Sequence, residues 1–364
     1  MTTIARAAVL RETGKPLVIE EVELEDPRPF EVVVRMESVG VCRTDTHALH
    51  EAPPPAILGH EGAGVVEAVG SGVTKVAVGD KVLTTFASCG TCRRCLLAQV
   101  AYCERFMELN FSGGRGDGTT AARSAGKPVA THFLGQSCFA THAVVGERSV
   151  VATDPAWDLR PLSPFGCGFQ TGAGAVLNNL RPPVGSSIAV CGTGAVGLSA
   201  IAAAALAGCE PIVAVDTVAS RLETARRFGA TETVDATQGD IGEVLGRLVP
   251  GGLDYAVDTT GVAAVVASAV GALNTRGTCA IVGAGASSEM VLDWRTVLNG
   301  RTVTGVIAGD SVPEVFLPQL VGLHLSGRFP VAELITYFPF DDINKAIDAS
   351  IRGDVVKPVL TFGS

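Results

Sequence analysis

The segment SIAVCGTGAVG, residues 187–197, decides the fold of much of this chain. A strand-like run, Ser187–Cys191, leads directly into Gly192-Thr193-Gly194-Ala195-Val196-Gly197, which matches G-x-G-x-x-G. The first glycine permits a tight turn, the second lets a pyrophosphate approach the backbone, and the third lets a helix pack closely on the strand. The segment therefore predicts a dinucleotide-binding turn at the N-terminus of a helix.

Asp216 lies at the end of the next predicted strand, nineteen residues after Gly197. A carboxylate there can accept hydrogen bonds from a ribose 2′-hydroxyl and would repel a 2′-phosphate, which favours NAD over NADP. Arg221 is close enough in sequence to contact the cofactor, so NADP remains an alternative cofactor. Arg226 and Arg227 suit a solvated helix face. A glycine-rich turn that binds no cofactor is disfavoured, because strand, glycines and acid all stand where the motif requires them.

Strand-like and helix-like segments alternate from Ile188 onward. The predicted strands are Ile188–Cys191, Ile212–Val215, Tyr255–Val257 and Cys279–Val282, and the predicted helices are Ala195–Ala207, Ser220–Phe228 and Val262–Leu273. This alternation is typical of a parallel, doubly wound sheet. We therefore predict an α/β dinucleotide-binding domain at residues 170–306.

The first part of the chain is β-rich. Short β-branched runs such as Val32–Val34 and Val65–Val69 are bounded by Gly, Pro and charged residues, which predicts an antiparallel, barrel-like domain. The Gly-rich segment Ser112–Lys127 is predicted to be a surface loop. After residue 306 only one clear helix is predicted, around Asp341–Ser350, and this tail is expected to return to the first domain. The first domain then comprises residues 1–169 and 307–364.

Composition limits the functional classes. The 364 residues carry a net charge of −9, which argues against nucleic acid as the main partner. The uncharged stretch Val184–Cys209 is interrupted by glycines and fits a buried strand, turn and helix better than a membrane span. The first eleven residues have no apolar signal-peptide core, so ten cysteines indicate a reducing, cytoplasmic setting with metal sites or free thiols.

Four cysteines lie within fifteen residues in the pattern C-x2-C-x2-C-x7-C: Cys89, Cys92, Cys95 and Cys103. Four neighbouring thiolates suit a tetrahedral zinc site, usually closed and structural. An iron–sulfur cluster is the main alternative, while two-residue spacings disfavour disulfides. We expect a metal-binding lobe at about residues 86–106.

A second group of possible ligands is spread along the chain. Gly59-His60-Glu61-Gly62 places an imidazole beside a carboxylate, Cys42 lies eighteen residues upstream of His60, and Cys167 lies where the two domains should meet. Two cysteines and a histidine, with water or substrate as the fourth ligand, form a known catalytic zinc set. Each residue alone could equally be a buried small hydrophobe or a core histidine.

The chain resembles the zinc-dependent medium-chain alcohol dehydrogenases over nearly its full length. The segments that match, in the family order, are VGVCRTD at 39–45, LGHEGAG at 58–64, the cysteine cluster, GCG at 166–168, Thr171-Gly172 and the glycine motif. The resemblance implies a GroES-like, β-rich catalytic domain joined to a Rossmann-type domain.

The resemblance also implies two zinc ions per chain. Cys42, His60 and Cys167 would bind the catalytic zinc, Glu61 would approach it during ligand exchange, and Asp45 would orient His60. The four clustered cysteines would bind the structural zinc.

Roles in cofactor binding and proton transfer follow from the same resemblance. Arg43 and Lys357 would reach the cofactor pyrophosphate, and Thr44 and His47 would relay the alcohol proton by way of the nicotinamide ribose. Thr171 matches a contact near the nicotinamide. Weaker correspondences place Val282 along the nicotinamide face and Thr259 and Thr260 in the cofactor cleft, although ordinary strand-end packing also explains these three.

The segment from Tyr102 to Gly113 resembles the bacterial aryl- and allylic-alcohol branch, which includes benzyl alcohol dehydrogenases. The expected reaction is reversible oxidation of a primary aromatic or allylic alcohol to the aldehyde by NAD, in a homodimer or homotetramer. Phe86, Phe133 and Leu134 are candidate pocket walls, although ordinary core packing explains them nearly as well. Alternatives are a broad-specificity aliphatic alcohol dehydrogenase, a zinc-free reductase of the superfamily, which would lack both ligand sets, and a non-catalytic zinc-binding interaction protein.

Overall fold

The computed structural model describes residues 3–285 and 289–363. It divides into two compact units. Unit 1 contains residues 1–167, 312–322 and 332–364, and unit 2 contains residues 168–311 and 323–331. Residues 168–169, 307–311 and 323–331 thus group with unit 2, whereas the sequence predicted them in the first domain. Among the described residues, no helix is both long enough and apolar enough to span a bilayer.

Unit 2 is built on a six-stranded, wholly parallel sheet of order β13-β12-β11-β14-β15-β16. Numbered within the unit, this is the order 3-2-1-4-5-6 of a dinucleotide-binding fold. The strands are β11 (Ile188–Cys191), β12 (Ile212–Asp216), β13 (Glu232–Asp235), β14 (Leu253–Asp258), β15 (Leu273–Ile281) and β16 (Thr302–Gly305). The order reverses between β11 and β14, so a crevice for a ligand is expected at the carboxyl ends of these two strands.

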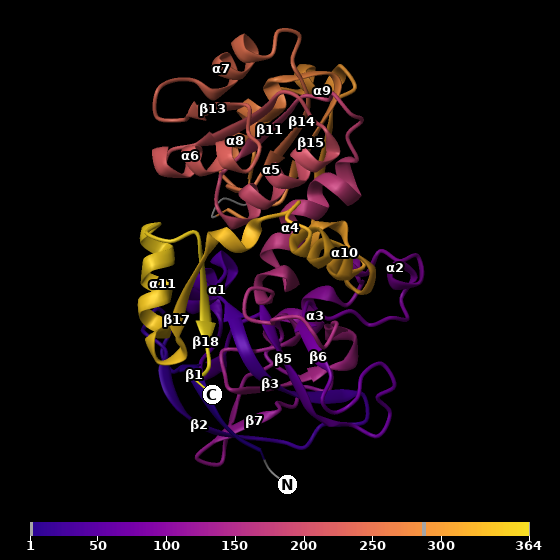
Figure 1. Ribbon diagram of the computed structural model, residues 1–364, viewed down its shortest axis with the longest axis vertical. Coiled ribbons are helices and arrows are strands. Elements are labelled where there is room, and N and C mark those ends of the chain that lie inside the picture. The colour runs from indigo at the N-terminus through magenta and orange to yellow at the C-terminus, as the bar shows by residue number, and fades with distance from the viewer. Residues whose placement is uncertain (1–2, 286–288, 364) are drawn as a thin grey trace. The chain divides into compact units, whose positions relative to one another are not determined.

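Helices surround this sheet (Figure 1). They are α4 (Gly168–Gly174), continued by the π-helical turn Ala175–Leu180, then α5 (Ala195–Ala207), α6 (Ala219–Arg227), α7 (Ile241–Leu248), α8 (Ala263–Gly271) and α9 (Trp294–Leu298). Alternate strand residues such as Val213 and Val215 share one face and pack with Leu245 of α7 and Val266 of α8 in the buried core. The predicted doubly wound fold is confirmed.

Unit 1 contains two mostly antiparallel sheets. One has the order β4-β1-β2-β7-β8, and the other has the order β10-β6-β5-β3-β18-β17, with β9 also pairing with β3. The strands are β1 (Thr3–Leu10), β2 (Val18–Leu24), β3 (Glu31–Gly40), β4 (Ala56–Ile57), β5 (Gly62–Val69), β6 (Lys81–Thr84), β7 (Ala122–Ser124), β8 (Lys127–Val129), β9 (His142–Gly146), β10 (Val150–Ala152), β17 (Ile335–Pro339) and β18 (Lys357–Thr361). The prediction of a surface loop over Ser112–Lys127 was wrong in part, because β7 forms within it and pairs with β2.

The remaining α-helices belong to unit 1, except that the end of α10 groups with unit 2. They are α1 (Arg43–Glu51), α2 (Arg93–Leu96), α3 (Phe106–Phe111), α10 (Pro313–Leu325) and α11 (Ile343–Arg352). Helix α2 belongs to a lobe that stands out from the sheets of unit 1 (Figure 1). Strand β18 pairs antiparallel with β3, so the tail returns to unit 1 as expected from the sequence.

Candidate functional site

Four possible metal ligands from distant parts of the sequence meet in unit 1: Cys42, His60, Glu61 and Cys167. One ligand atom from each lies within 4.8 Å of all the others. Cys42 follows β3 and caps α1, His60 and Glu61 precede β5, and Cys167 directly follows the 3-10 turn Ser163–Gly166. The structure therefore brings together the residues that the sequence analysis assigned to the catalytic zinc.

Strand pairing explains why they meet. β3 and β5 are antiparallel with Val39 opposite Gly62, so the end of β3 lies beside the start of β5. The amide of Gly40 donates to the carbonyl of Glu61 at 2.9 Å and extends this pairing up to the ligands. Gly59 has φ +88°, a left-handed conformation that favours glycine, and it turns the chain just before His60.

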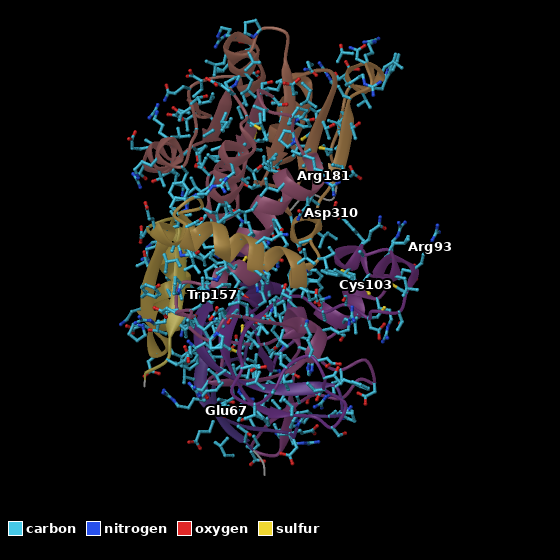
Figure 2. All side chains as sticks on the ribbon, turned by 45° about the vertical axis from the view of Figure 1, so that its right-hand side comes forward. Glu67, Arg93, Cys103, Trp157, Arg181 and Asp310 are labelled. Atoms are coloured by element: carbon cyan, nitrogen blue, oxygen red, sulfur yellow. The ribbon has the colours of Figure 1, made fainter. Side chains whose placement is uncertain are left out.

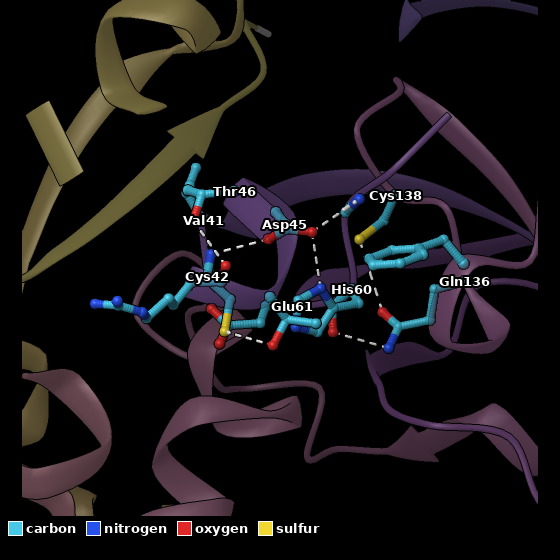
Figure 3. Close-up of polar contacts among 12 residues, drawn as sticks. Val41, Cys42, Asp45, Thr46, His60, Glu61, Gln136 and Cys138 are labelled. Carbon is cyan, nitrogen blue, oxygen red and sulfur yellow. Dashed lines mark hydrogen bonds and ion pairs between the residues drawn. The ribbon is translucent and has the colours of Figure 1, made fainter. Parts of the chain in front are cut away.

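Asp45 joins the pieces of this cluster (Figure 3). Its carboxylate accepts from the amide of Cys42 at 2.9 Å and from the amide of Gly59 at 3.2 Å, and it lies 2.8 Å from Nδ1 of His60. Asp45 is the third residue of α1, and its bond to Cys42 is half of a capping box. One buried carboxylate thus starts the helix and fixes the His60 ring, as expected of a residue that orients a metal ligand.

The second ring nitrogen of His60 is the observation that fits a metal. Nε2 is buried and, among the described residues, has no hydrogen-bond partner, although buried polar atoms are normally satisfied. Burial lowers the pKa of His60, but the Asp45 carboxylate and Cys42 outweigh this and raise the pKa well above its usual value. Cys167 donates a hydrogen bond to Cys42, which lowers the pKa of Cys42 and favours its thiolate. An imidazole nitrogen and two sulfurs directed at one point suit zinc.

Glu61 is held by Lys357. The Lys357 ammonium donates to both carboxylate oxygens at 3.0 and 2.9 Å, and to the carbonyl of Val41 at 3.2 Å. Lys357 is only 2% exposed, because β18 carries it to the end of β3. Burial raises the pKa of Glu61 to about 7, and Lys357 opposes this rise. In the structure Lys357 thus pairs with Glu61; its predicted contact with a cofactor pyrophosphate stays a prediction.

Residues 86–106, here called the four-cysteine lobe, form the second possible metal site. The sulfurs of Cys89, Cys92, Cys95 and Cys103 all lie within 4.8 Å of one another. The amide of Cys92 donates to the Cys89 sulfur at 3.3 Å, and the amide of Cys89 donates to the Cys103 sulfur at 3.3 Å. Burial raises the pKa of Cys89, but hydrogen bonds from Thr91 and Cys92 outweigh it and lower the pKa to about 6. Cys103 lies on the inner side of the lobe, whereas Arg93 points away from it (Figure 2).

This second site also fits zinc. All four donors are sulfurs, none of the ten cysteines forms a disulfide, and amide donors stabilise thiolates. Four protein ligands leave no position for a substrate, so this set is closed. At the other site Lys357 binds the Glu61 carboxylate, so Cys42, His60 and Cys167 are left as ligands with one position open.

The predicted dinucleotide turn lies in unit 2 at the point where the sheet order reverses. A Cβ added to Gly197 would lie 1.8 Å from the carbonyl oxygen of Gly192, so only glycine permits this approach of helix and turn. The Thr259 hydroxyl, beyond β14, donates to the carbonyl of Gly192 at 3.0 Å. One Asp216 oxygen accepts from the amide and hydroxyl of Thr193 at 2.6 and 2.7 Å. Asp216 therefore supports the turn from the end of β12.

The remaining predicted residues are placed as follows. Arg43 is exposed at the start of α1, and Thr44 Oγ1 lies 3.8 Å from the Cys42 sulfur. His47, on the same helix, and Thr171, in α4, are half-buried.

The partly buried Arg221 has no partner for Nε among the described residues. Thr260 donates to Asp258 at 2.6 Å, and the amide of Val282 donates to the Asp258 carbonyl at 2.8 Å. Gly194, Ala195 and Val196 form the turn and the first residues of α5.

Two residues near His60 were missed by sequence reasoning. The Gln136 side-chain amide donates to the His60 carbonyl at 2.8 Å (Figure 3), and the ring of Phe111 contacts that of Phe133, which contacts His60. Gln136 follows a turn in which His132, Leu134 and Gly135 have positive φ. Only Gly135 is a residue type that favours this conformation, and a single glycine does not predict such a turn. Phe133 and Leu134 are buried in this turn.

Known proteins match the chain over both units. The family model of the alcohol dehydrogenase GroES-like domain matches residues 28–155, and that of the zinc-binding dehydrogenases matches residues 195–321. A geraniol dehydrogenase from Castellaniella defragrans is 40% identical over 98% of each chain.

Two solved structures share the whole fold. A zinc-binding-domain alcohol dehydrogenase protein from Burkholderia ambifaria is 44% identical, with a TM-score of 0.97 and complete coverage of both chains. Benzyl alcohol dehydrogenase from Acinetobacter calcoaceticus is 36% identical, with a TM-score of 0.95 over 99% of this chain and 100% of the other. With both ligand sets and the dinucleotide turn present, these matches show that the chain belongs to the zinc-dependent alcohol dehydrogenases of the medium-chain family.

Proposed function

We propose that this protein oxidises a primary aromatic or allylic alcohol to the aldehyde, reversibly, with hydride transfer to NAD. The observation that carries the proposal is the buried, unpaired Nε2 of His60, held by Asp45 and directed toward the sulfurs of Cys42 and Cys167. A structural metal site would have four protein ligands, so three such donors with an open position favour a site that accepts substrate.

The chain's residues have distinct roles in this reaction. Cys42, His60 and Cys167 would hold a zinc ion, which when bound acts as a Lewis acid on the substrate hydroxyl. Asp45 keeps Nδ1 of His60 protonated and thereby leaves Nε2 free to coordinate. Lys357 neutralises Glu61, so the pocket does not carry an uncompensated carboxylate beside the two sulfurs.

The proton of the alcohol has a path along α1. Thr44 presents its hydroxyl 3.8 Å from the Cys42 sulfur, and a hydroxyl can accept a proton while donating its own. His47, one turn further along α1 and half-buried, can pass the proton to solvent, because one ring nitrogen of an imidazole accepts a proton while the other donates one. In the proposed relay, the nicotinamide ribose joins these two residues.

Asp216 supports NAD as the cofactor. One of its oxygens is committed to Thr193 and the other accepts from the amides of Thr217 and Val218, so the carboxylate is fixed at the turn. A fixed negative charge at the end of the second strand repels a 2′-phosphate, and a ribose hydroxyl would take the place of the Thr193 hydroxyl as a donor to it.

The substrate class rests on the relatives. One is a geraniol dehydrogenase and another a benzyl alcohol dehydrogenase, which act on an allylic and an aromatic alcohol. The rings of Phe133 and Phe111 next to His60 agree with a substrate that has a flat, apolar group next to its hydroxyl. A broad aliphatic specificity is the second candidate.

A homodimer or homotetramer completes the proposal. β16 is an edge strand of the parallel sheet, and α9, just before it, leaves Trp294 64% and Leu298 72% exposed. An unpaired strand edge beside exposed apolar side chains favours association with a second copy. Ten unpaired cysteines agree with a reducing, cytoplasmic location.

A substrate screen with both cofactors tests the proposal. Benzylic, allylic and short aliphatic primary alcohols are compared by kcat/KM, each with NAD and with NADP. We expect benzylic or allylic alcohols to exceed aliphatic ones of equal carbon number by about tenfold or more, and NAD to be preferred. A preference for short aliphatic alcohols would contradict the substrate class, and no NADH formation with any alcohol would contradict the reaction.

A further inference from the structure

The four-cysteine lobe is tied to helix α3, which begins three residues after Cys103. The tie is Asn110, whose side chain is completely buried. Its amide donates to the carbonyls of Ala87 at 3.0 Å and Phe106 at 2.8 Å, and its oxygen accepts from the amide of Ala87 at 2.8 Å. Since Ala87 lies two residues before Cys89, both ends of the lobe are joined where α3 ends. The position of α3 therefore depends on the shape of the lobe.

A row of rings leads from α3 to the proposed metal ligand. Phe106 and Phe111, at the two ends of α3, have ring centroids 6.4 Å apart. Phe111 meets Phe133 edge-to-face at 5.8 Å and 82°, and Phe133 meets the His60 imidazole edge-to-face at 5.6 Å and 79°. Edge-to-face contacts of this kind favour one relative orientation of the rings.

These rings restrict the one movement of the His60 side chain that its hydrogen bonds still allow. Asp45 fixes Nδ1, and Gln136 fixes the backbone carbonyl of His60. The imidazole can still tilt about the line from its backbone to Asp45, and such a tilt would move Nε2 away from the sulfurs. Phe133 lies against the ring and opposes the tilt, and Phe111 in turn supports Phe133.

We propose that Phe111 is a positioning residue that acts through Phe133 on His60, so that the four-cysteine lobe influences how firmly the catalytic site retains its metal. This inference rests on the proposed role of His60 as a zinc ligand. It gives the lobe a second task besides stability, since a change in the lobe would reach His60 along α3. Phe111 is 42% exposed, so its ring can be altered at small cost to the core.

The test follows zinc release from the two-zinc protein into an excess of a chromogenic chelator. Cys42→Ser identifies the catalytic phase, because that phase should vanish in this variant while the lobe phase remains. We expect Phe111→Leu, which keeps an apolar side chain but removes the ring, to accelerate the catalytic phase about three- to tenfold. The matched control is Met107→Ala, on the same helix and 67% exposed, which should release zinc at the wild-type rate.

A double variant decides whether the effect passes through Phe133. Phe133→Leu should accelerate the catalytic phase, and adding Phe111→Leu to it should produce no further acceleration. Equal release rates in Phe111→Leu and Met107→Ala, or equal acceleration of both phases, would overturn the inference. If Phe133→Leu does not fold, the comparison of Phe111→Leu with Met107→Ala decides alone. If Cys42→Ser removes neither phase, the ligand assignment in the proposed function fails, which is a separate result.

Discussion

The two metal-type clusters of unit 1 are built in opposite ways. The four-cysteine lobe takes all its ligands from one short segment, and backbone amides of the same segment donate to their sulfurs. The Cys42, His60 and Cys167 set comes from three distant segments. Asp45 supports it from the Cys42 segment, and Gln136 and Lys357 support it from two further ones. The difference teaches that a closed site needs only a folded loop, whereas an open, reactive site needs the whole unit to hold its ligands.

Removing a ligand from the open site should have the largest effect. Cys42→Ser is expected to lower kcat/KM by about a thousandfold or more, because the metal loses a thiolate and its hold on the substrate hydroxyl. Metal analysis should show that the lobe keeps its zinc, and circular dichroism that the fold is retained. Turnover within tenfold of wild type would contradict a catalytic role for the Cys42 site and a purely structural one for the lobe.

Removing a ligand from the closed site should affect stability first. Cys103→Ser is expected to reduce the zinc content from two ions to one per chain and to lower the free energy of unfolding by about 3 to 5 kcal/mol. Metal analysis and denaturant unfolding measure the two effects. Wild-type stability with a single zinc remaining would deny the lobe its structural role.

Acid should weaken the part of unit 1 around Glu31. Arg115 contacts Glu31 at 2.6 and 2.9 Å, and His132, next to Phe133, lies 3.8 Å from the same carboxylate. Burial raises the pKa of Glu31, but His132 and Arg115 outweigh it and lower the pKa to about 2. A lowered carboxyl pKa stabilises the fold above its ordinary value of 4.5 and loses that effect as the pH falls toward 2.

The Glu31 carboxylate should therefore contribute about 3 kcal/mol at neutral pH that disappears between about pH 4.5 and 2. Urea unfolding of wild type and Glu31→Gln at pH 7 and pH 3 measures it. The variant should be less stable at pH 7 and should approach the wild type at pH 3. A difference that is the same at both pH values would assign the effect to packing instead of charge.

The smallest effect is expected from a change that disturbs the orientation of His60 but removes no metal ligand. Asp45→Asn retains the size of the side chain but removes the charge beside His60, and should weaken zinc binding at the open site about 10- to 100-fold. Competition with a chelator of known affinity measures this change, and the four-cysteine lobe serves as the internal control. Equal weakening at both sites would show a general loosening of unit 1.

The sequence predicted the parallel sheet closely because its signals are local. β11 and α5 have the predicted bounds, since the glycines of the turn can only stand between such a strand and helix. β13 was not predicted, because its four residues are too few to show a period. α7 was missed although its apolar residues recur at helical spacing, at Ile241, Val244, Leu245 and Leu248.

At the site, residue types and spacing predicted the metal ligands but not the residues that hold these ligands in place. Gln136 and Phe111 act through a carbonyl bond and a ring contact. Gln136 leaves no pattern in the sequence, and Phe111 lies in the branch-like segment 102–113, which indicated no contact with His60. The Lys357–Glu61 pair depends on β18 lying beside β3, a pairing across more than three hundred residues that no local signal reveals.

The pairing of β18 with β3 joins two residues that are synthesised at very different times. Every other strand and helix of unit 1 precedes β18 in the chain, so during synthesis Glu61 is made long before its counter-charge. A pocket that encloses the Glu61 carboxylate before Lys357 arrives would lack this buried ion pair, which is unfavourable. Strand β18 must therefore be synthesised before the pocket around His60 can close with the Lys357–Glu61 ion pair in place.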